Sequence, residues 1–104
     1  MDRPSGRPLG YNATLVMQAL AQNAGYGFEV MRLTDLPAGT VYPLLRRLEA
    51  SGHLSSRWES DSESAGEGRP QRRYYAVTDK GDEALREARE RLRRQLGLLE
   101  ISAT

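Results

Sequence analysis

The chain has 104 residues, 38% hydrophobic and 28% charged, which is the size and composition of one globular domain. The lack of cysteine excludes disulfides, thiolate catalysis and thiolate metal sites, and no apolar run approaches the roughly 20 residues that span a bilayer. With a formal net charge of +1, any binding of nucleic acid must depend on a local basic surface. The first eight residues lack the apolar core of a secretory signal, so we expect a cytoplasmic protein with no membrane association.

The N-terminal part is expected to be a flexible arm followed by a helix. Residues 1–10 contain two prolines and two glycines, a composition typical of irregular chain. A helix is predicted from about Asn12, its candidate N-cap, to Asn23, because apolar residues recur there at i,i+4 spacing.

Two further helices are predicted in the first half of the chain. A short one fits residues 28–34, just after the two glycines that flank Tyr26. The next begins within a few residues of Gly39 and ends before Gly52, and its apolar residues follow i, i+3, i+4, i+7 spacing. The residues expected to face inward are Phe28, Met31 and Leu33, and then Val41, Leu44, Leu45 and Leu48.

The second half of the chain predicts a hairpin and a long helix. Strand-like alternation occurs over residues 54–59 and 73–77. Between them, residues 60–71 are rich in Ser, Gly and acid and predict a long, mobile hairpin loop. The last helix is expected to run from Thr78, its N-cap, to about Glu100.

This order of elements predicts a mainly α (α+β) fold, the winged helix-turn-helix with a two-stranded wing and an added C-terminal dimerisation helix. Residues 1–10 are assigned to the arm, 11–77 to the winged helix-turn-helix domain and 78–104 to the dimerisation helix. The expected core comprises Leu15, Leu20, Phe28, Val41, Leu45, Leu48, Trp58 and Tyr75.

The last helix suggests a homodimer. Its apolar stripe is Leu85, Ala88, Leu92, Leu96 and Leu99. Three helices and a hairpin already close a winged-helix core, and each leucine left in water would forgo about 1.5–3 kcal/mol. Pairing with a second copy would bury both stripes, although the helix could instead fold back on its own domain.

The outer face of the third predicted helix carries the candidate DNA contacts. Without the inward stripe, the remaining residues are Thr40, Tyr42, Pro43, Arg46 and Arg47. Such a helix fits the major groove, where these side chains can bond to phosphates or base edges. The alternative is a solvated surface with Tyr42 packed on a neighbour.

The end of the hairpin loop adds a second basic group. Arg69, Arg72 and Arg73 lie within five residues and suit contact with phosphates or the minor groove. The alternative is that they protect an exposed hairpin edge from pairing.

No residue pattern predicts an enzyme. His53 is the only histidine, and it has no partner set for nucleophilic catalysis or metal binding, so we read it as an ordinary turn residue. The glycine-rich stretches lack the phosphate-loop lysine. We therefore expect no catalytic residue, no metal and no cofactor.

Three blocks of sequence occur in a fixed order that resembles the PadR family of bacterial transcriptional regulators. They are residues 25–30, which resemble the opening of the second helix, residues 39–49, which resemble the recognition helix, and residues 68–70 with 73–81, which resemble the wing and the strand before the last helix. The resemblance covers roughly residues 9–100.

The resemblance implies a homodimeric regulator, usually a repressor, that binds a roughly palindromic double-stranded DNA operator. It implies a short form with one dimerising helix, and family members are often released by a small phenolic or hydrophobic ligand. By position, Thr40, Tyr42 and Arg46 would meet DNA from the third helix and Arg69 from the wing, with Tyr26 and Arg47 as further candidates.

Two other functions stay open on the sequence alone. A winged-helix module for contact with another protein would show little salt dependence. A nonspecific architectural DNA binder would bind any duplex with similar affinity.

Overall fold

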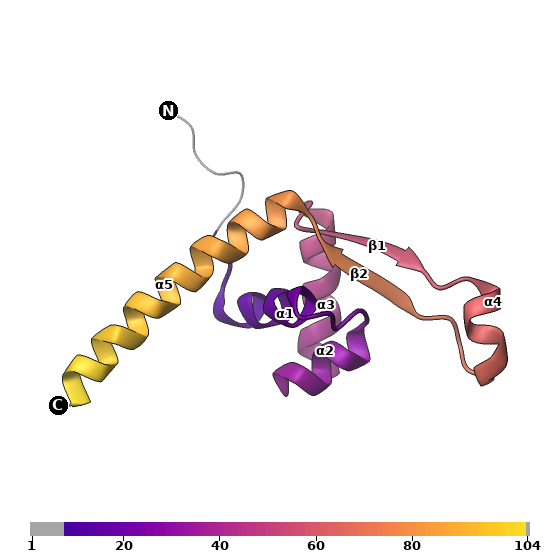
Figure 1. Cartoon of the computed structure of the whole chain (residues 1–104), viewed down its shortest axis with the longest axis horizontal. Coiled ribbons are helices and arrows are strands. Elements are labelled where there is room, and N and C mark those ends of the chain that lie inside the picture. The colour runs from indigo at the N-terminus through magenta and orange to yellow at the C-terminus, as the bar shows by residue number, and fades with distance from the viewer. Residues whose placement is uncertain (1–7, 104) are drawn as a thin grey trace.

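The computed structural model describes residues 8–103 and has the winged helix-turn-helix fold (Figure 1). Its main elements are the helices α1 (Tyr11–Ala21), α2 (Gly27–Thr34) and α3 (Ala38–Ala50), the strands β1 (Leu54–Trp58) and β2 (Arg73–Val77), and the helix α5 (Asp79–Ala103). The first three helices pack together, the antiparallel strands form the wing, and α5 extends away from both (Figure 1).

The core lies where the first three helices meet the wing and the start of α5. Its most buried large side chains are Val16, Met17, Val30, Val41, Leu45 and Leu85. The predicted stripe of α3 is buried along its whole length, which confirms that helical spacing alone identifies the inward face of this helix.

Three apolar side chains expected inside lie outside. In α2 the inward position belongs to Val30, which is fully buried, whereas Phe28 and Leu33 are 57% and 53% exposed. Trp58 is 58% exposed, because the far end of β1 projects beyond the three helices (Figure 1). Leu15 is only half-buried.

The first helix is not capped by Asn12, as the sequence suggested. The N–H and the hydroxyl of Thr14 both bond to the carbonyl oxygen of Gly10, at 2.9 and 2.8 Å. Just before it, Leu9 is buried, and its carbonyl oxygen accepts a 2.8 Å hydrogen bond from Arg91. The end of the predicted arm is therefore anchored, and its first seven residues lie outside the described part.

The connection between the strands contains helical turns. A short helix, α4 (Asp61–Ser64), is followed by one 3-10 turn, η1 (Ala65–Glu67). The sequence predicted an irregular loop here, because a four-residue helix is too short to show a periodic apolar pattern.

The long helix α5 begins as predicted, and its two parts have different surroundings. The Thr78 hydroxyl caps it by accepting a 3.1 Å hydrogen bond from the N–H of Gly81. The first turns pack on α1 and β2, and the remainder of a helix about 37 Å long projects into solvent (Figure 1).

The predicted dimer stripe is consequently divided. Leu85 and Ala88 are each only 1% exposed and belong to the core of their own chain, so a second copy cannot cover them. Leu92 is half-buried, while Leu96 and Leu99 are 59% and 64% exposed. The alternative in which the helix folds back on its domain is therefore correct for its first half only.

Gly81 allows the close approach between α5 and the turn that precedes β1. A Cβ atom at this position would collide with the carbonyl oxygen of His53 and lie 3.0 Å from Met17 Cε. We expect Gly81→Ala to lower the free energy of unfolding by about 1–3 kcal/mol in urea denaturation. Gly97→Ala is the matched control on the same helix, since the added methyl has no atom within 4 Å apart from adjacent residues and the helix's own backbone, and it should raise stability by up to about 1 kcal/mol. Equal effects of the two substitutions would contradict this packing.

Candidate nucleic-acid interface

The exposed face of α3 carries the side chains that the sequence assigned to DNA. Tyr42, Pro43, Arg46 and Arg47 are exposed, and Thr40 is half-buried. They lie opposite the buried stripe, so this face of the helix is available for an external partner.

The start of α2 supports this face. The Tyr42 ring lies so close to Gly27 that an added Cβ would come within 2.7 Å of Tyr42 Cζ. Asp35 ends α2 in a left-handed conformation, with φ of 61°, and turns the chain into α3. The alternative reading of Tyr42 as packed on a neighbour is thus partly correct, because the ring is 40% exposed and also contacts α2.

The wing is joined to the start of α2 by backbone and ring contacts. Tyr26 forms an isolated antiparallel bridge with Tyr74, and the N–H of Tyr75 donates to the carbonyl oxygen of Gly25 at 2.8 Å. The rings of Tyr26 and Tyr74 meet edge to face, with centroids 5.6 Å apart. The guanidinium of Arg72 stacks on the Tyr26 ring at 4.2 Å, so the wing carries this cation next to the helices.

The wing is also joined to α3. Arg73 approaches both carboxylate oxygens of Glu49 at 3.3 and 3.4 Å and donates to the Ser56 hydroxyl at 3.1 Å. The Ser56 hydroxyl in turn donates to Glu49 at 2.5 Å, and the Arg73 guanidinium lies 5.2 Å from the Trp58 ring. These contacts fix β1 and β2 relative to the candidate recognition helix.

Arg69 is engaged inside the wing. Its two terminal nitrogens donate to the Glu59 carboxylate at 2.6 and 3.0 Å, and its Nε donates to Glu67 at 2.5 Å. Above all, the hydrogen bond from Arg69 lowers the pKa of Glu59 to about 2, although burial of this carboxyl, 4% exposed, acts in the opposite direction. The Arg69 side chain is 20% exposed, so little of its guanidinium faces solvent.

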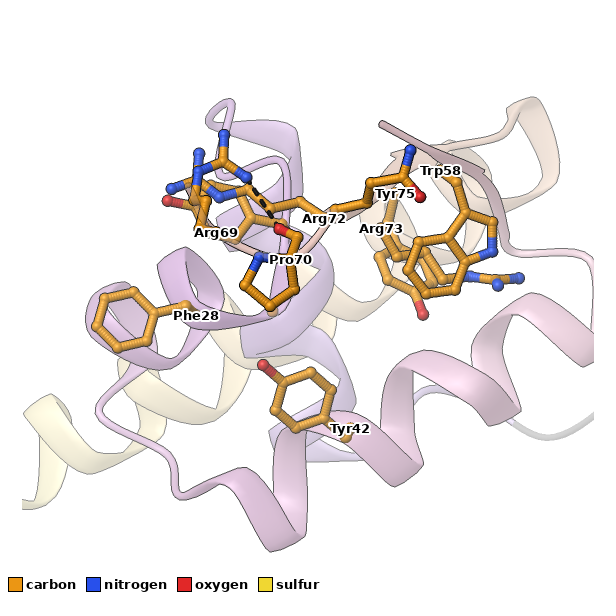
Figure 2. A pocket seen from close by; sticks show the side chains of 11 residues that line it. Phe28, Tyr42, Trp58, Arg69, Pro70, Arg72, Arg73 and Tyr75 are labelled. Atoms are coloured by element: carbon orange, nitrogen blue, oxygen red, sulfur yellow. Dashed lines mark hydrogen bonds between the residues drawn. The ribbon is translucent and has the colours of Figure 1, made fainter. Parts of the chain in front are cut away.

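The helices and the wing enclose a groove of about 610 Å³ (Figure 2). Tyr42 enters it from α3, and the wing supplies most of the opposite wall (Figure 2). The described residues that line it include three arginines and four exposed or half-buried aromatic side chains besides Tyr42, but no carboxylate: Arg69, Arg72 and Arg73 with Tyr26, Phe28, Trp58 and Tyr75. The groove therefore gathers arginines and aromatic rings on one surface, although the carboxylates that pair with Arg69 and Arg73 lie outside its lining.

Phe28 and Trp58 are groove residues that the sequence interpretation placed in the core. For Phe28 the sequence held a partial signal. Phe28 and Val30 are two residues apart and point about 160° away from each other in a helix, so both cannot face the core. For Trp58 the strand alternation gives the face but not the point at which the core ends.

The remaining findings on the described part of the chain concern metal binding, membrane spans and His53. No three His, Asp or Glu side chains gather there to hold a metal ion, and none of its helices is long and apolar enough to cross a membrane. His53 is buried in the turn after α3, where its Nδ1 lies 2.6 Å from the Ser51 hydroxyl. Burial, aided by the charge of Lys80, lowers the pKa of this imidazole.

Comparison with known proteins identifies relatives with this architecture. Residues 16–87 match the Transcriptional regulator PadR-like family. A PadR family transcriptional regulator from Eggerthella lenta DSM 2243 is 35% identical, with a TM-score of 0.66 over 88% of this chain and 83% of that one. A PadR family regulator from Clostridium difficile R20291 shares the fold at 23% identity, with a TM-score of 0.77 over 91% of this chain and 100% of that one.

A more distant structure comes from Bordetella bronchiseptica. It is BpsR, whose DNA binding is regulated by 6-hydroxynicotinic acid, and it is 18% identical, with a TM-score of 0.61 over 77% of this chain and 56% of that one. No curated protein matches the chain.

The pair formed by Glu59 and Arg69 makes stability depend on pH in acid. The pKa of Glu59 is about 2 in the fold against an ordinary 4.5, so the carboxylate stabilises the fold fully above pH 4.5 and loses this effect as pH falls toward 2. We expect Glu59→Gln to lower the thermal midpoint by a similar margin at pH 5 and pH 7, and this margin to narrow below pH 4.5 in calorimetry. A margin that stays constant down to pH 2 would contradict the assignment.

Proposed function

The chain belongs to the PadR-like family of transcriptional regulators, and we propose that it is a homodimeric, sequence-specific repressor without enzymatic activity. The observation that carries the proposal is the groove between α3 and the wing, where aromatic rings gather with three arginines and no carboxylate is among the described lining residues. Arg69 and Arg73 are paired with carboxylates outside the lining, whereas Arg72 stacks on Tyr26. A duplex with acidic phosphates and readable base edges is the partner that fits this surface. The chain would act in the bacterial cytoplasm, where the operator is located.

In this proposal each α3 enters a major groove. Its N-terminal residues penetrate deepest, so Thr40, Tyr42 and Pro43 would approach base edges, while Arg46 and Arg47 would contact bases or phosphates. From the wing, Arg72 stacked on Tyr26 would approach the backbone of the DNA. Arg69 was also predicted as a contact, but its bonds to Glu59 and Glu67 favour a supporting role.

The second half of α5 supports the homodimer. Leu92, Leu96 and Leu99 continue the stripe beyond the part of the helix that its own core covers. The radius of gyration is 15.9 Å, against about 13 Å for a compact chain of this length, because α5 projects. A two-fold pairing of these helices would bury the leucines and set two α3 helices about 34–36 Å apart on one face of the DNA.

We also propose release by a small hydrophobic or phenolic ligand. Support comes from the family resemblance and from BpsR, whose DNA binding responds to 6-hydroxynicotinic acid. Such a ligand would act by binding one geometry of the dimer better than the other. Operator affinity measured with and without a panel of phenolic acids tests this, and an unchanged affinity throughout would count against it.

Arg46 provides the test of sequence-specific binding. We expect Arg46→Ala to weaken binding to a duplex of the chain's own upstream intergenic DNA by about 1–3 kcal/mol, with a smaller loss on a scrambled duplex. Arg93→Ala is the control, since it removes the same charge from α5, and it should change both affinities slightly and equally. The measurement is the anisotropy of dye-labelled duplexes, and an equal loss on both for Arg46→Ala would favour an architectural binder.

Leu96 provides the test of the dimer. Because this side chain is 59% exposed, Leu96→Glu should leave the domain folded and place a charge in the proposed seam, which would yield monomers. Arg94→Glu alters charge on the opposite side of the same helix and should leave the dimer intact. Light scattering gives the mass, and a dimeric Leu96→Glu protein would exclude this interface.

A further inference from the structure

The wing contains a buried carboxylate that bonds almost entirely to the strand opposite it and to the turn before that strand. Glu59 follows β1 and is only 4% exposed. Its carboxylate accepts hydrogen bonds from both terminal nitrogens of Arg69, from the N–H of Arg72 at 3.1 Å and from the hydroxyl of Tyr74 at 3.3 Å. Its backbone N–H donates to the carbonyl oxygen of Arg72 at 2.7 Å. Both the N–H and the carbonyl oxygen of Arg72 are therefore bonded to Glu59.

These bonds close a ring of contacts that includes the start of α2. Glu59 holds the backbone of Arg72, the guanidinium of Arg72 stacks on Tyr26, the ring of Tyr26 meets the ring of Tyr74, and the hydroxyl of Tyr74 returns to Glu59. Each member thus restricts the next. Arg72 lines the groove, whereas Glu59, which accepts the hydrogen bond from its backbone N–H, does not.

The guanidinium of Arg69 is used for hydrogen bonds within the wing. It is bonded to two carboxylates and also donates to the carbonyl oxygen of Pro70 at 3.2 Å. A guanidinium that is already neutralised has little attraction left for a phosphate. Its contribution is to balance the charge of Glu59, which would otherwise be buried without a partner.

We propose that Glu59 is a positioning residue for DNA binding, an acidic side chain that strengthens the grip of the wing on DNA by fixing Arg72 over Tyr26. This inference rests on the proposed function and deepens it. The negative charge of Glu59 is compensated locally by Arg69, so it does not repel the duplex, and its hydrogen bonds order the cation that meets the duplex.

If Glu59 acts only through its charge, Glu59→Gln should strengthen DNA binding; if it positions Arg72, the substitution should weaken binding. Loss of a carboxylate near a DNA-binding surface should strengthen binding if only the overall field matters. Glutamine, however, places an amide NH2 where Arg69, the N–H of Arg72 and the Tyr74 hydroxyl all donate to Glu59, so part of the arrangement around Arg72 is lost. We expect the dissociation constant for the upstream intergenic duplex to rise at least fivefold in anisotropy measurements at fixed salt.

Glu67→Gln is the matched control. It removes the same charge from the same loop, at a side chain that is 57% exposed and bonds only to Arg69 among these groups. Its dissociation constant should stay within twofold of the natural chain or decrease. A Glu59→Gln protein that is folded and binds as tightly as the Glu67→Gln protein would overturn the proposal.

A double-mutant cycle with Arg72→Gln separates positioning from a general loss of structure. If Glu59 acts through Arg72, the double variant binds no more weakly than Arg72→Gln alone. Each single variant should also reduce the slope of log affinity against log salt by about one, the share of one phosphate contact. The proposal would be overturned if the losses of affinity of the two single variants multiply in the double variant, or if the slope of log affinity against log salt does not change.

Tyr74→Phe keeps the experiment decisive if Glu59→Gln does not fold by circular dichroism. It removes only the hydroxyl that donates to Glu59 and retains the ring that meets Tyr26. We expect Tyr74→Phe to raise the dissociation constant about twofold in the natural chain and to leave it unchanged in the Arg72→Gln background. No rise in the natural chain would overturn the proposal. A natural chain that does not distinguish its upstream DNA from a scrambled duplex would instead reject the proposed function.

Discussion

The burial of Leu85 and Ala88 is the contact on which the arrangement of the rest depends. Three helices and a two-stranded wing make a small core, and the first turns of α5 complete it. The same contact fixes the direction in which the second half of α5 leaves the domain, with Arg89 bonded to Gln18 and Arg91 bonded to Leu9 as lateral supports. One helix therefore completes the core of its own chain and sets the direction of the surface at which we propose that a second copy binds.

The features that follow from short-range rules were predictable from the sequence. The stripe of α3 needs only helical spacing, and the Thr78 cap needs only a hydroxyl three residues before a free N–H. The inward side of α2 was not predictable in the same way, because eight residues give too few repeats to choose between Phe28 and Val30. The continuous stripe of α5 also gives no sign that Leu85 belongs to one core and Leu96 to another surface.

The candidate interface was predicted in its residue types but not in its connections. Spacing along α3 was enough to find the exposed Arg46 and Arg47. The pairing of Glu59 with Arg69 joins residues that lie ten apart across a loop, and that pairing exists only once the two strands are in register. The sequence shows three arginines near the wing, whereas the structure distinguishes one bonded to Glu59, one bonded to Glu49 and one stacked on Tyr26.

The exposure of Trp58 has a practical consequence for spectroscopy. It is the only tryptophan in the chain, and it lies on the wall of the groove beside Arg73, 58% exposed, not in the core. We therefore expect its emission to change when the groove is occupied. Because the indole is already largely in water in the folded chain, the same emission is a poor indicator of unfolding. The chain thus carries a built-in optical probe at the surface where a partner is proposed to bind.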